Sequence, residues 1–173
     1  EILGNKFTDS DAILSLIKKK PNELSQEYSN YLLKTLDDSK LFNKVSVKLE
    51  DNSYIININE YSNINRVYFQ NNERFDKEEL EELLIEFDLI NLNPISIKLF
   101  ISELKKLYES FGYNDIQIKY DYDLNEEKNI ADLYFEINEG TITKIKNIYF
   151  DGNENFDDQL LKSIIKSKTK TLI

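Results

Sequence analysis

The chain has 173 residues, a formal net charge of −10 and 40% hydrophobic residues, and it contains neither cysteine nor histidine. The hydrophobic content is sufficient for small folded domains, whereas the negative charge argues against a nucleic-acid partner, because phosphate backbones repel an acidic protein. Without thiols and imidazoles, the chain lacks the usual ligands of zinc and the usual groups of nucleophilic enzymes. We therefore expect a protein that is not an enzyme and that binds no cofactor and no metal.

The N-terminal part of the chain predicts the end of a strand followed by two helices. Residues 1–7 (EILGNKF) lead almost at once into a Gly-Asn turn, so most of the opening strand is missing. Thr8 or Ser10 can cap a helix that runs to about Lys19. A second helix is expected over Ser25 to Leu36, with Ser25 as its N-cap.

A hairpin follows these two helices. Apolar residues alternate with polar ones on both sides of a turn at residues 51–53, which is typical of two paired strands with one buried face. The alternating apolar residues are Val45, Val47 and Leu49 before the turn, and Tyr54, Ile56 and Ile58 after it.

The next segment predicts a strand and an amphipathic helix. The strand is expected over Ile64 to Phe69, and Asp76 stands three residues before Glu79 in a capping-box arrangement that marks the start of a helix. Apolar residues at helical spacing follow, namely Leu80, Leu83, Leu84 and Phe87. We expect this apolar stripe to pack on a sheet.

A second helix begins at Asn93 and Pro94, which suit the N-cap and first helical positions, and Gly112 is a natural stop. Its apolar stripe consists of Ile97, Ile101, Leu104, Tyr108 and Phe111.

Two alternating strands close this unit, Ile116 to Tyr122 and Ala131 to Ile137, joined by a loop over Asp123 to Asn129. The order is strand, helix, helix, strand, strand, as in the preceding unit. Both helices need one face of a sheet to cover their apolar stripes. The sequence therefore predicts an α+β fold made of β-α-α-β-β units.

A repeated phrase divides the chain into units. Residues 64–75 read INRVYFQNNERF, residues 145–156 read IKNIYFDGNENF, and the N-terminal EILGNKF is a clipped third copy. We therefore expect a first unit at residues 1–62, a complete second unit at residues 63–141 and the beginning of a third unit at residues 142–173.

The beginning of the third unit predicts a strand over Ile145 to Phe150 and a helix around Gln159 to Lys166. The apolar residues of this helix are Leu160, Leu161, Ile164 and Ile165. Two elements cannot close a core, so we interpret the chain as a piece of a longer protein.

Four motifs in this chain resemble POTRA (polypeptide-transport-associated) domains of the BamA family of outer-membrane β-barrel assembly proteins. They are the GN-x-x-F junction within Phe150 to Phe156, the YESFGY helix end at Tyr108 to Tyr113, the DSKLFNKVSV strand entry at Asp38 to Val47, and the INEG turn at Ile137 to Gly140. Their order is most similar to the first, second and beginning of the third POTRA domain. The resemblance implies tandem POTRA domains, each with a three-stranded mixed sheet covered on one face by two helices.

One departure from the family pattern concerns the turn of the middle copy, where Asn71-Asn72 replaces Gly-Asn. Asparagine tolerates positive φ better than most residues, so we expect the turn to keep its geometry.

The resemblance also implies a function and a location. It places the chain in the periplasm, attached to the outer membrane through a C-terminal barrel outside this chain. The implied partners are unfolded outer-membrane β-barrel proteins, accessory lipoproteins and periplasmic chaperones. The hairpin strand after the helices would lie at the edge of each sheet and accept a further strand through its main chain, a process called β-augmentation.

The expected peptide-binding strands are Val45, Ser46, Val47, Lys48 and Leu49 in the first unit, and Ile116, Gln117, Ile118, Lys119, Tyr120, Asp121 and Tyr122 in the second. Lys119 and Asp121 could equally be charges that discourage edge association. The expected joints between units are Glu60, Tyr61 and Ser62, and Asn138, Glu139, Gly140, Thr141 and Ile142.

Alternative functions remain open at this point. The array could be a passive spacer or scaffold, or belong to a TamA-type, two-partner secretion or chloroplast import protein. An RNA-binding KH domain needs a GxxG loop between its helices, and residues 19–25 and 88–94 contain no glycine.

A calcium site of the EF-hand type is not expected, although four residues match part of the pattern. Asp121, Asp123, Asn125 and Asp132 stand at loop positions 1, 3, 5 and 12. Glu126 stands where the pattern requires glycine, and alternating strands replace the flanking helices.

Overall fold

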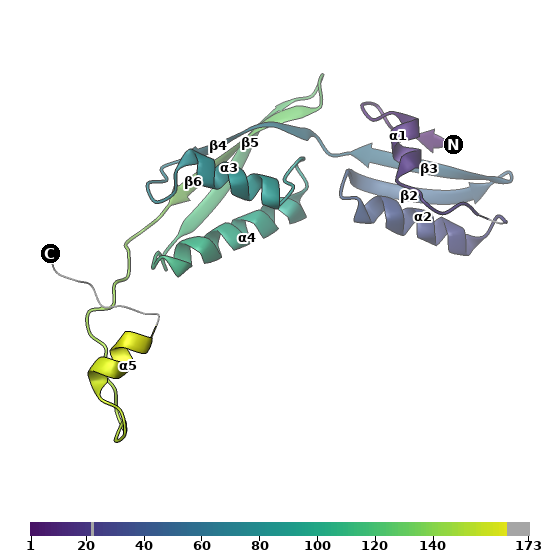
Figure 1. The fold of residues 1–173 in the computed structure, drawn as a ribbon. Helices are drawn as coiled ribbons and strands as arrows, with labels where there is room; N and C mark the ends of the chain where they lie inside the picture. Colours follow the sequence, from purple (N-terminus) through teal and green to yellow (C-terminus); the bar gives the residue numbers. More distant parts are fainter. Residues whose placement is uncertain (22, 166–173) are drawn as a thin grey trace.

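The computed structural model describes residues 1–21 and 23–165, which form two α+β units followed by a short segment (Figure 1). The first unit contains β1 (Ile2–Leu3), α1 (Ser10–Ser15), α2 (Gln26–Asp38), β2 (Phe42–Glu50) and β3 (Ser53–Glu60). The second contains β4 (Asn63–Gln70), α3 (Lys77–Glu86), α4 (Pro94–Ser110), β5 (Gln117–Asn125) and β6 (Ile130–Asn138). The segment after β6 carries α5 (Asp158–Ile164). The α+β prediction and the order of elements in both units are confirmed.

Each unit has one three-stranded mixed sheet with the last strand of the unit in its centre. The strand orders are β1-β3-β2 and β4-β6-β5. In each sheet the opening strand pairs with the central strand in parallel, and the hairpin partner pairs with it antiparallel. The strand that follows the two helices, β2 or β5, therefore lies at a sheet edge.

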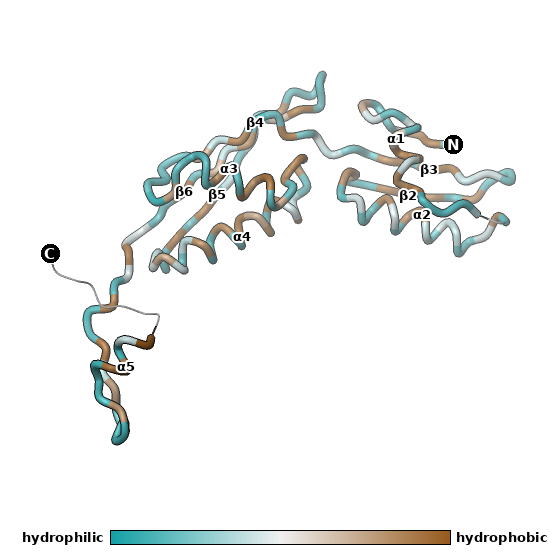
Figure 2. Tube along the Cα trace, in the orientation of Figure 1, coloured by the Kyte–Doolittle hydropathy of each residue, from teal (hydrophilic) through white to brown (hydrophobic). Residues whose placement is uncertain are grey.

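Each unit buries its own core between helices and sheet. The core of the first unit consists of Ile13, Leu32, Leu36, Phe42, Ile56 and Ile58. The core of the second unit is larger and consists of Phe75, Leu80, Leu89, Ile97, Phe100, Leu104, Tyr108, Ile116, Ile118, Leu133, Phe135 and Ile137. In Figure 2 the turns are mostly hydrophilic, and hydrophobic residues recur along the helices and strands. None of the described helices combines the length and apolarity needed to cross a membrane.

The apolar stripe of α4 differs from the prediction at two positions. Phe100 is buried although the predicted stripe omitted it, and Phe111 is 43% exposed although the stripe included it. Phe111 is the C-cap residue, so it lies beyond the helical repeat, and the guanidinium of Arg74 covers its ring at 3.9 Å. Phe100 stands three residues after Ile97, and residues three apart lie on the same helix face, as residues four apart do.

Both hairpins form, and the second is longer than predicted. Val45 pairs with Ile58 and Leu49 with Tyr54, as the alternation predicts. In the second unit the predicted loop over Asp123 to Asn129 is wrong, because β5 continues to Asn125 and pairs there with Ile130. The strand begins at Gln117, one residue later than predicted. Main-chain pairing with β6 extends the strand through residues of low β propensity.

Most helix starts follow the predicted caps. Ser25, Asp76 and Asn93 cap α2, α3 and α4, and the capping box of Asp76 and Glu79 is present. The prediction for α1 is wrong at both ends, because Asp9 is the N-cap and the helix ends at Ser15.

Contacts elsewhere in the first unit account for the short α1. The backbone N–H of Thr8 donates to Glu60, and the Asp9 carboxylate accepts from Asp11 N–H at 2.8 Å. The backbone of Lys19 bonds to the hydroxyls of Tyr28 and Tyr31 and is not part of a helix.

The repeated Asn closes the same turn in all three copies. The side-chain amides of Asn5, Asn72 and Asn153 donate to the carbonyls of Thr8, Phe75 and Phe156 at 3.1, 2.9 and 2.9 Å. The residues before them, Gly4, Asn71 and Gly152, have φ of 87°, 60° and 76°. Asn71 therefore adopts the left-handed conformation, and the expectation that the middle turn keeps its geometry is confirmed.

The strand predicted over Ile145 to Phe150 does not form, so this prediction is wrong. Strands need a partner for their main-chain groups, and no described strand pairs with this segment. Helix α5 forms where a helix was predicted, but it begins at Asp158, one residue earlier than predicted, and ends at Ile164. Lys166, the last predicted residue, lies outside the described residues.

Candidate functional site

Among the described strands, β5 has a neighbour on one side only, and the direction of its main-chain groups can be derived from the register. The N–H of Asn63 donates to the carbonyl of Asn129 at 3.0 Å, so odd-numbered residues of β6 turn their main-chain groups toward β4. Even-numbered residues of β6 consequently bond to the odd-numbered residues of β5. The N–H and C=O groups that point away from the sheet belong to Ile118, Tyr120, Tyr122 and Leu124.

The edge strand β2 has the same organisation. The N–H of Ile56 donates to the carbonyl of Glu1 at 2.9 Å, so even-numbered residues of β3 face β1. The outward main-chain groups of β2 are then those of Val45, Val47 and Leu49. In both units, the residues whose main-chain groups point outward are those whose apolar side chains lie on the helix side of the sheet.

The side chains of β5 make this edge amphipathic. On the helix side, Ile118 is buried and Tyr120 half-buried, whereas Tyr122 and Leu124 are 45% and 44% exposed because the hairpin extends past the helices. Although Tyr122 alternates in register with Ile118 and Tyr120, it therefore does not pack beneath the helices.

The opposite face of the same sheet is polar and mostly acidic. Lys119, Asp121 and Asp123 of β5 share this face with Asp132, Tyr134 and Glu136 of β6, which lie opposite them across the hairpin. The ring of Tyr134 stacks on Tyr68 at 4.9 Å. Desolvation, followed by the charge and hydrogen bond of Asp123, raises the pKa of the Tyr134 hydroxyl. A shallow hollow lies on this face beside Lys119, Asp121 and Tyr134.

The four residues that match part of the EF-hand pattern, Asp121, Asp123, Asn125 and Asp132, do not form a metal site in the described part of the chain. Asp123 and Asp132 face one another across the hairpin, and Asn125 lies at the end of β5. Within residues 1–21 and 23–165, no three His, Cys, Asp or Glu side chains are grouped so that they could hold a metal ion.

Glu60, expected at a joint, holds a turn within its own unit. Its carboxylate accepts the backbone N–H groups of Lys6, Phe7 and Thr8 at 3.0, 3.1 and 2.7 Å. Burial alone would raise the pKa of Glu60, but these bonds and that of the Thr8 side chain outweigh it, and the pKa is lowered.

Glu139 occupies the equivalent position in the second unit. It accepts the backbone N–H groups of Glu73 and Arg74 at 2.7 and 2.8 Å and the hydroxyl of Tyr108 at 3.1 Å. Burial and the charge of Glu139 raise the pKa of Tyr108, so this hydroxyl stays a donor. Glu60 and Glu139 each end an Ile-Asn-Glu triplet, at residues 58–60 and 137–139, and each accepts the backbone N–H groups of a turn in its own unit.

The lowered pKa of Glu60 leads to a pH-dependent stability. A carboxyl group with a depressed folded-state pKa stabilises the fold above its unfolded pKa of about 4.3, and this contribution is lost as the pH falls through the folded pKa. We expect Glu60→Gln to be destabilised by about 1 kcal/mol at pH 7, and the difference from wild type to shrink as the pH falls through the lowered folded-state pKa. Urea unfolding followed by circular dichroism at several pH values measures this difference. A difference that is the same at pH 7 and pH 3 would contradict the assignment.

The joint between the first and second units is fastened by buried asparagines. The side-chain amides of Asn91 and Asn93 both donate to the carbonyl of Lys40, at 3.0 and 3.5 Å. Asn91 and Asn93 are buried in the second unit, whereas Lys40 follows α2 of the first.

The connection between β3 and β4, at Tyr61 and Ser62, is also held by hydrogen bonds. Tyr61 N–H donates to the Leu41 carbonyl at 3.1 Å, and Leu92 N–H donates to the Ser62 carbonyl at 2.9 Å. Asn129 bonds to the side chain of Ser62 and to the carbonyl of Tyr61. Sequence reasoning missed the bonds that Asn91, Asn93 and Asn129 make at this joint, because their partners are distant in the chain.

The second joint covers residues 138–142 and follows β6. Gly140 adopts a φ of 66°, and its N–H donates to the side chain of Asn138 at 3.2 Å. Just beyond, the N–H of Thr143 donates to the carbonyl of Gly112 at 2.7 Å. Ile142 is exposed.

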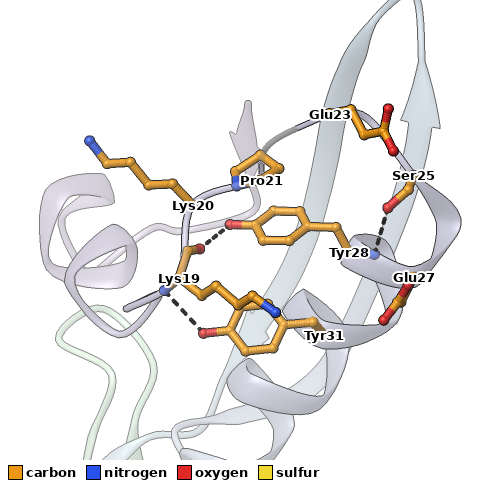
Figure 3. Close-up of a pocket in the computed structure, with 8 residues that line it drawn as sticks. All are labelled: Lys19, Lys20, Pro21, Glu23, Ser25, Glu27, Tyr28 and Tyr31. Carbon is orange, nitrogen blue, oxygen red and sulfur yellow. Dashed lines mark hydrogen bonds between the residues drawn. The ribbon is translucent and has the colours of Figure 1, made fainter.

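A hollow in the first unit lies between the loop before α2 and the helix itself (Figure 3). Tyr28 donates its hydroxyl to the Lys19 carbonyl, and Lys19 N–H donates to the hydroxyl of Tyr31 at 3.2 Å. Tyr54 bonds through its hydroxyl to the backbone of Ser25. These polar groups are satisfied within the chain, so they fix the loop against α2.

Comparison with known proteins gives one family match and several related proteins. Residues 62–140 match the POTRA family model, described as "Surface antigen variable number repeat". The chain is 22% identical over 173 residues to the outer membrane protein assembly factor BamA of Neorickettsia risticii (strain Illinois). That alignment covers 99% of this chain but only 23% of the relative, so the chain spans about a quarter of its length.

Two solved structures align with this chain over most of its length. POTRA domains 3–5 of Haemophilus influenzae BamA are 17% identical, with a TM-score of 0.45, and the alignment covers 98% of this chain and 76% of that one. The N-terminal domain of Omp85 from Thermosynechococcus elongatus is 12% identical, with a TM-score of 0.49 and coverages of 99% and 76%.

Proposed function

Because residues 62–140 of this chain match the POTRA family model, we propose that the chain belongs to the periplasmic region of an outer-membrane protein assembly factor. In this role it receives unfolded β-barrel precursors by adding them as extra strands to β5 and β2. It performs no catalysis, and accessory lipoproteins and periplasmic chaperones are its further partners. We assign residues 1–62, 63–141 and 142–173 to the first, second and beginning of the third POTRA domain.

The observation that carries this proposal is the open edge of β5. Four residues, Ile118, Tyr120, Tyr122 and Leu124, direct main-chain groups away from the sheet. A strand added there would form the same ladder that β6 forms on the other side. Pairing through the main chain depends little on sequence, which suits a module that binds many different precursors.

Tyr120→Pro is expected to weaken peptide binding about five- to tenfold without unfolding the domain. Proline removes the N–H of residue 120, which points away from β6, and its ring obstructs an incoming strand, while the bonds to β6 remain. The measurement is a titration of isotope-labelled protein with barrel-derived peptides, followed by amide shifts along β5 and β2.

Tyr120→Ala is the matched control, because it loses the same side chain and keeps the N–H. Equal affinities of the proline and alanine variants would count against main-chain pairing at β5.

A rigid scaffold is the second candidate function, and the fastened joint at Lys40, Asn91 and Asn93 favours it. A scaffold would hold partner proteins on its helix faces. Peptide-induced shifts confined to α2, α3 and α4, with none along β5 or β2, would support the scaffold and exclude strand addition.

A further inference from the structure

One of the outward main-chain groups of β5 is already occupied by a side chain. The N–H of Tyr122 donates to Asp121 Oδ1 at 2.8 Å. Among the described residues, no other side chain accepts from an outward N–H of β5 or β2. The ladder that an incoming strand would use is therefore interrupted at Tyr122.

We propose, on the basis of the proposed strand addition, that Asp121 determines which extended segments the β5 edge binds. Asp121 competes with the carbonyl of an incoming strand for the Tyr122 N–H. The edge accordingly selects an extended segment that is apolar on one face and carries lysine or arginine on the other.

The side chains on the helix side of the edge explain why the bound segment should be apolar on one face. Tyr122 and Leu124 share that side and are nearly half exposed, because the hairpin extends past the helices. Side chains of an added strand lie directly beside those of its neighbour, about 5 Å apart. Apolar residues of the segment would therefore cover Tyr122 and Leu124 and remove their surface from water.

The basic half of the preference follows from the opposite side. Displacing Asp121 from the Tyr122 N–H returns its exposed carboxylate to water, and a cation on the incoming strand would then pair with it directly. The same face carries three further carboxylates, those of Asp123 on β5 and of Asp132 and Glu136 on β6. Lys119 is the one cationic residue of these two strands, so the face is negatively charged. A lysine or arginine facing Asp121 would neutralise the displaced carboxylate, whereas a glutamate there would be repelled.

The bond between Asp121 and the Tyr122 N–H is tested without any peptide by hydrogen exchange of the Tyr122 amide. Asp121→Ala removes the acceptor and is expected to speed exchange about two- to tenfold, after correction for the intrinsic rate of the new sequence. Asp121→Asn keeps an acceptor oxygen and is expected to exchange more nearly like wild type. Asp123→Asn is the control, because it loses the same charge on the same face and lies beside Tyr134, away from the Tyr122 amide. Unchanged exchange in Asp121→Ala would overturn the proposal.

The selection is tested with two peptides of the same alternating sequence, one with lysine and one with glutamate on the polar face. The lysine peptide is expected to bind wild type about two- to fivefold more tightly at low salt. This preference should largely disappear in Asp121→Asn and persist in Asp123→Asn. Equal binding of both peptides to wild type, or a preference that survives in Asp121→Asn, would overturn the selection alone. If neither peptide shifts any β5 amide in any variant, the proposed strand addition fails, and the selection fails with it.

Discussion

Phe135→Ala is expected to lower the free energy of unfolding of the second unit by about 3–5 kcal/mol. Phe135 is fully buried in the central strand β6, where its ring contacts those of Phe69, Phe100 and Tyr120 at centroid distances of 5.5, 5.1 and 6.5 Å. Alanine leaves a cavity between the sheet and α4, and the surrounding rings are too rigid to fill it. Domains of this size are stable by only about 5–15 kcal/mol, so much of the stability would be lost.

Urea unfolding monitored by circular dichroism measures the loss, and hydrogen exchange assigns it to the second unit. Glu136→Ala is the control, because the adjacent side chain is exposed on the other face of the same strand. Its effect should stay within about 0.5 kcal/mol. A loss below about 1 kcal/mol in Phe135→Ala would mean that this ring is not part of a tightly packed core.

Glu139→Ala is expected to destabilise the second unit by about 2–4 kcal/mol. The substitution leaves the N–H groups of Glu73 and Arg74 and the buried hydroxyl of Tyr108 without their acceptor. Each buried donor that loses its partner costs about 1–3 kcal/mol, and the two N–H groups recover part of this by bonding to water. The turn before α3 should also become less ordered, which faster exchange of its amides would reveal.

A double-mutant cycle with Tyr108→Phe separates the two parts of this effect. Phenylalanine removes the buried donor, so Glu139→Ala should cost less in that background, by about 1 kcal/mol or more. Additive effects of the two substitutions would show that the contact between Tyr108 and Glu139 contributes nothing. Glu139→Gln, which keeps one acceptor oxygen, should fall between wild type and alanine.

Local patterns in the sequence predicted most of the fold. The pairing of Val45 with Ile58 follows from alternation and turn length, and the starts of α2, α3 and α4 follow from Ser25, Asp76 and Asn93. Each of these signals is complete within a few residues, so it can be interpreted without knowing the rest of the molecule.

Errors arose where distant contacts compete with local preference. Thr8 and Ser10 are acceptable caps, but the backbone of Thr8 bonds to Glu60, which is 52 residues away, and Asp9 caps the helix. Similarly, Asn91 donates to Lys40 across 51 residues, and no local pattern points to that bond.

The candidate site was predictable only in part. Alternation identifies β5 as a strand, and the family resemblance implies that it lies at an edge. Asp121 was expected only as a charge that could discourage edge association. Its bond to the Tyr122 N–H depends on which way that N–H points, and this direction follows from the register of three strands.

The bonds from Asn91 and Asn93 to Lys40 have a consequence for long polypeptides. In the proposed strand addition, they link the two edges that would accept a strand, β2 and β5, across the joint between the units. A chain already bound at one edge would meet the other at a high effective concentration, so that two weak attachments combine into strong avidity. A segment too short to reach both edges would gain nothing, and the array would thereby retain long unfolded polypeptides and release short fragments.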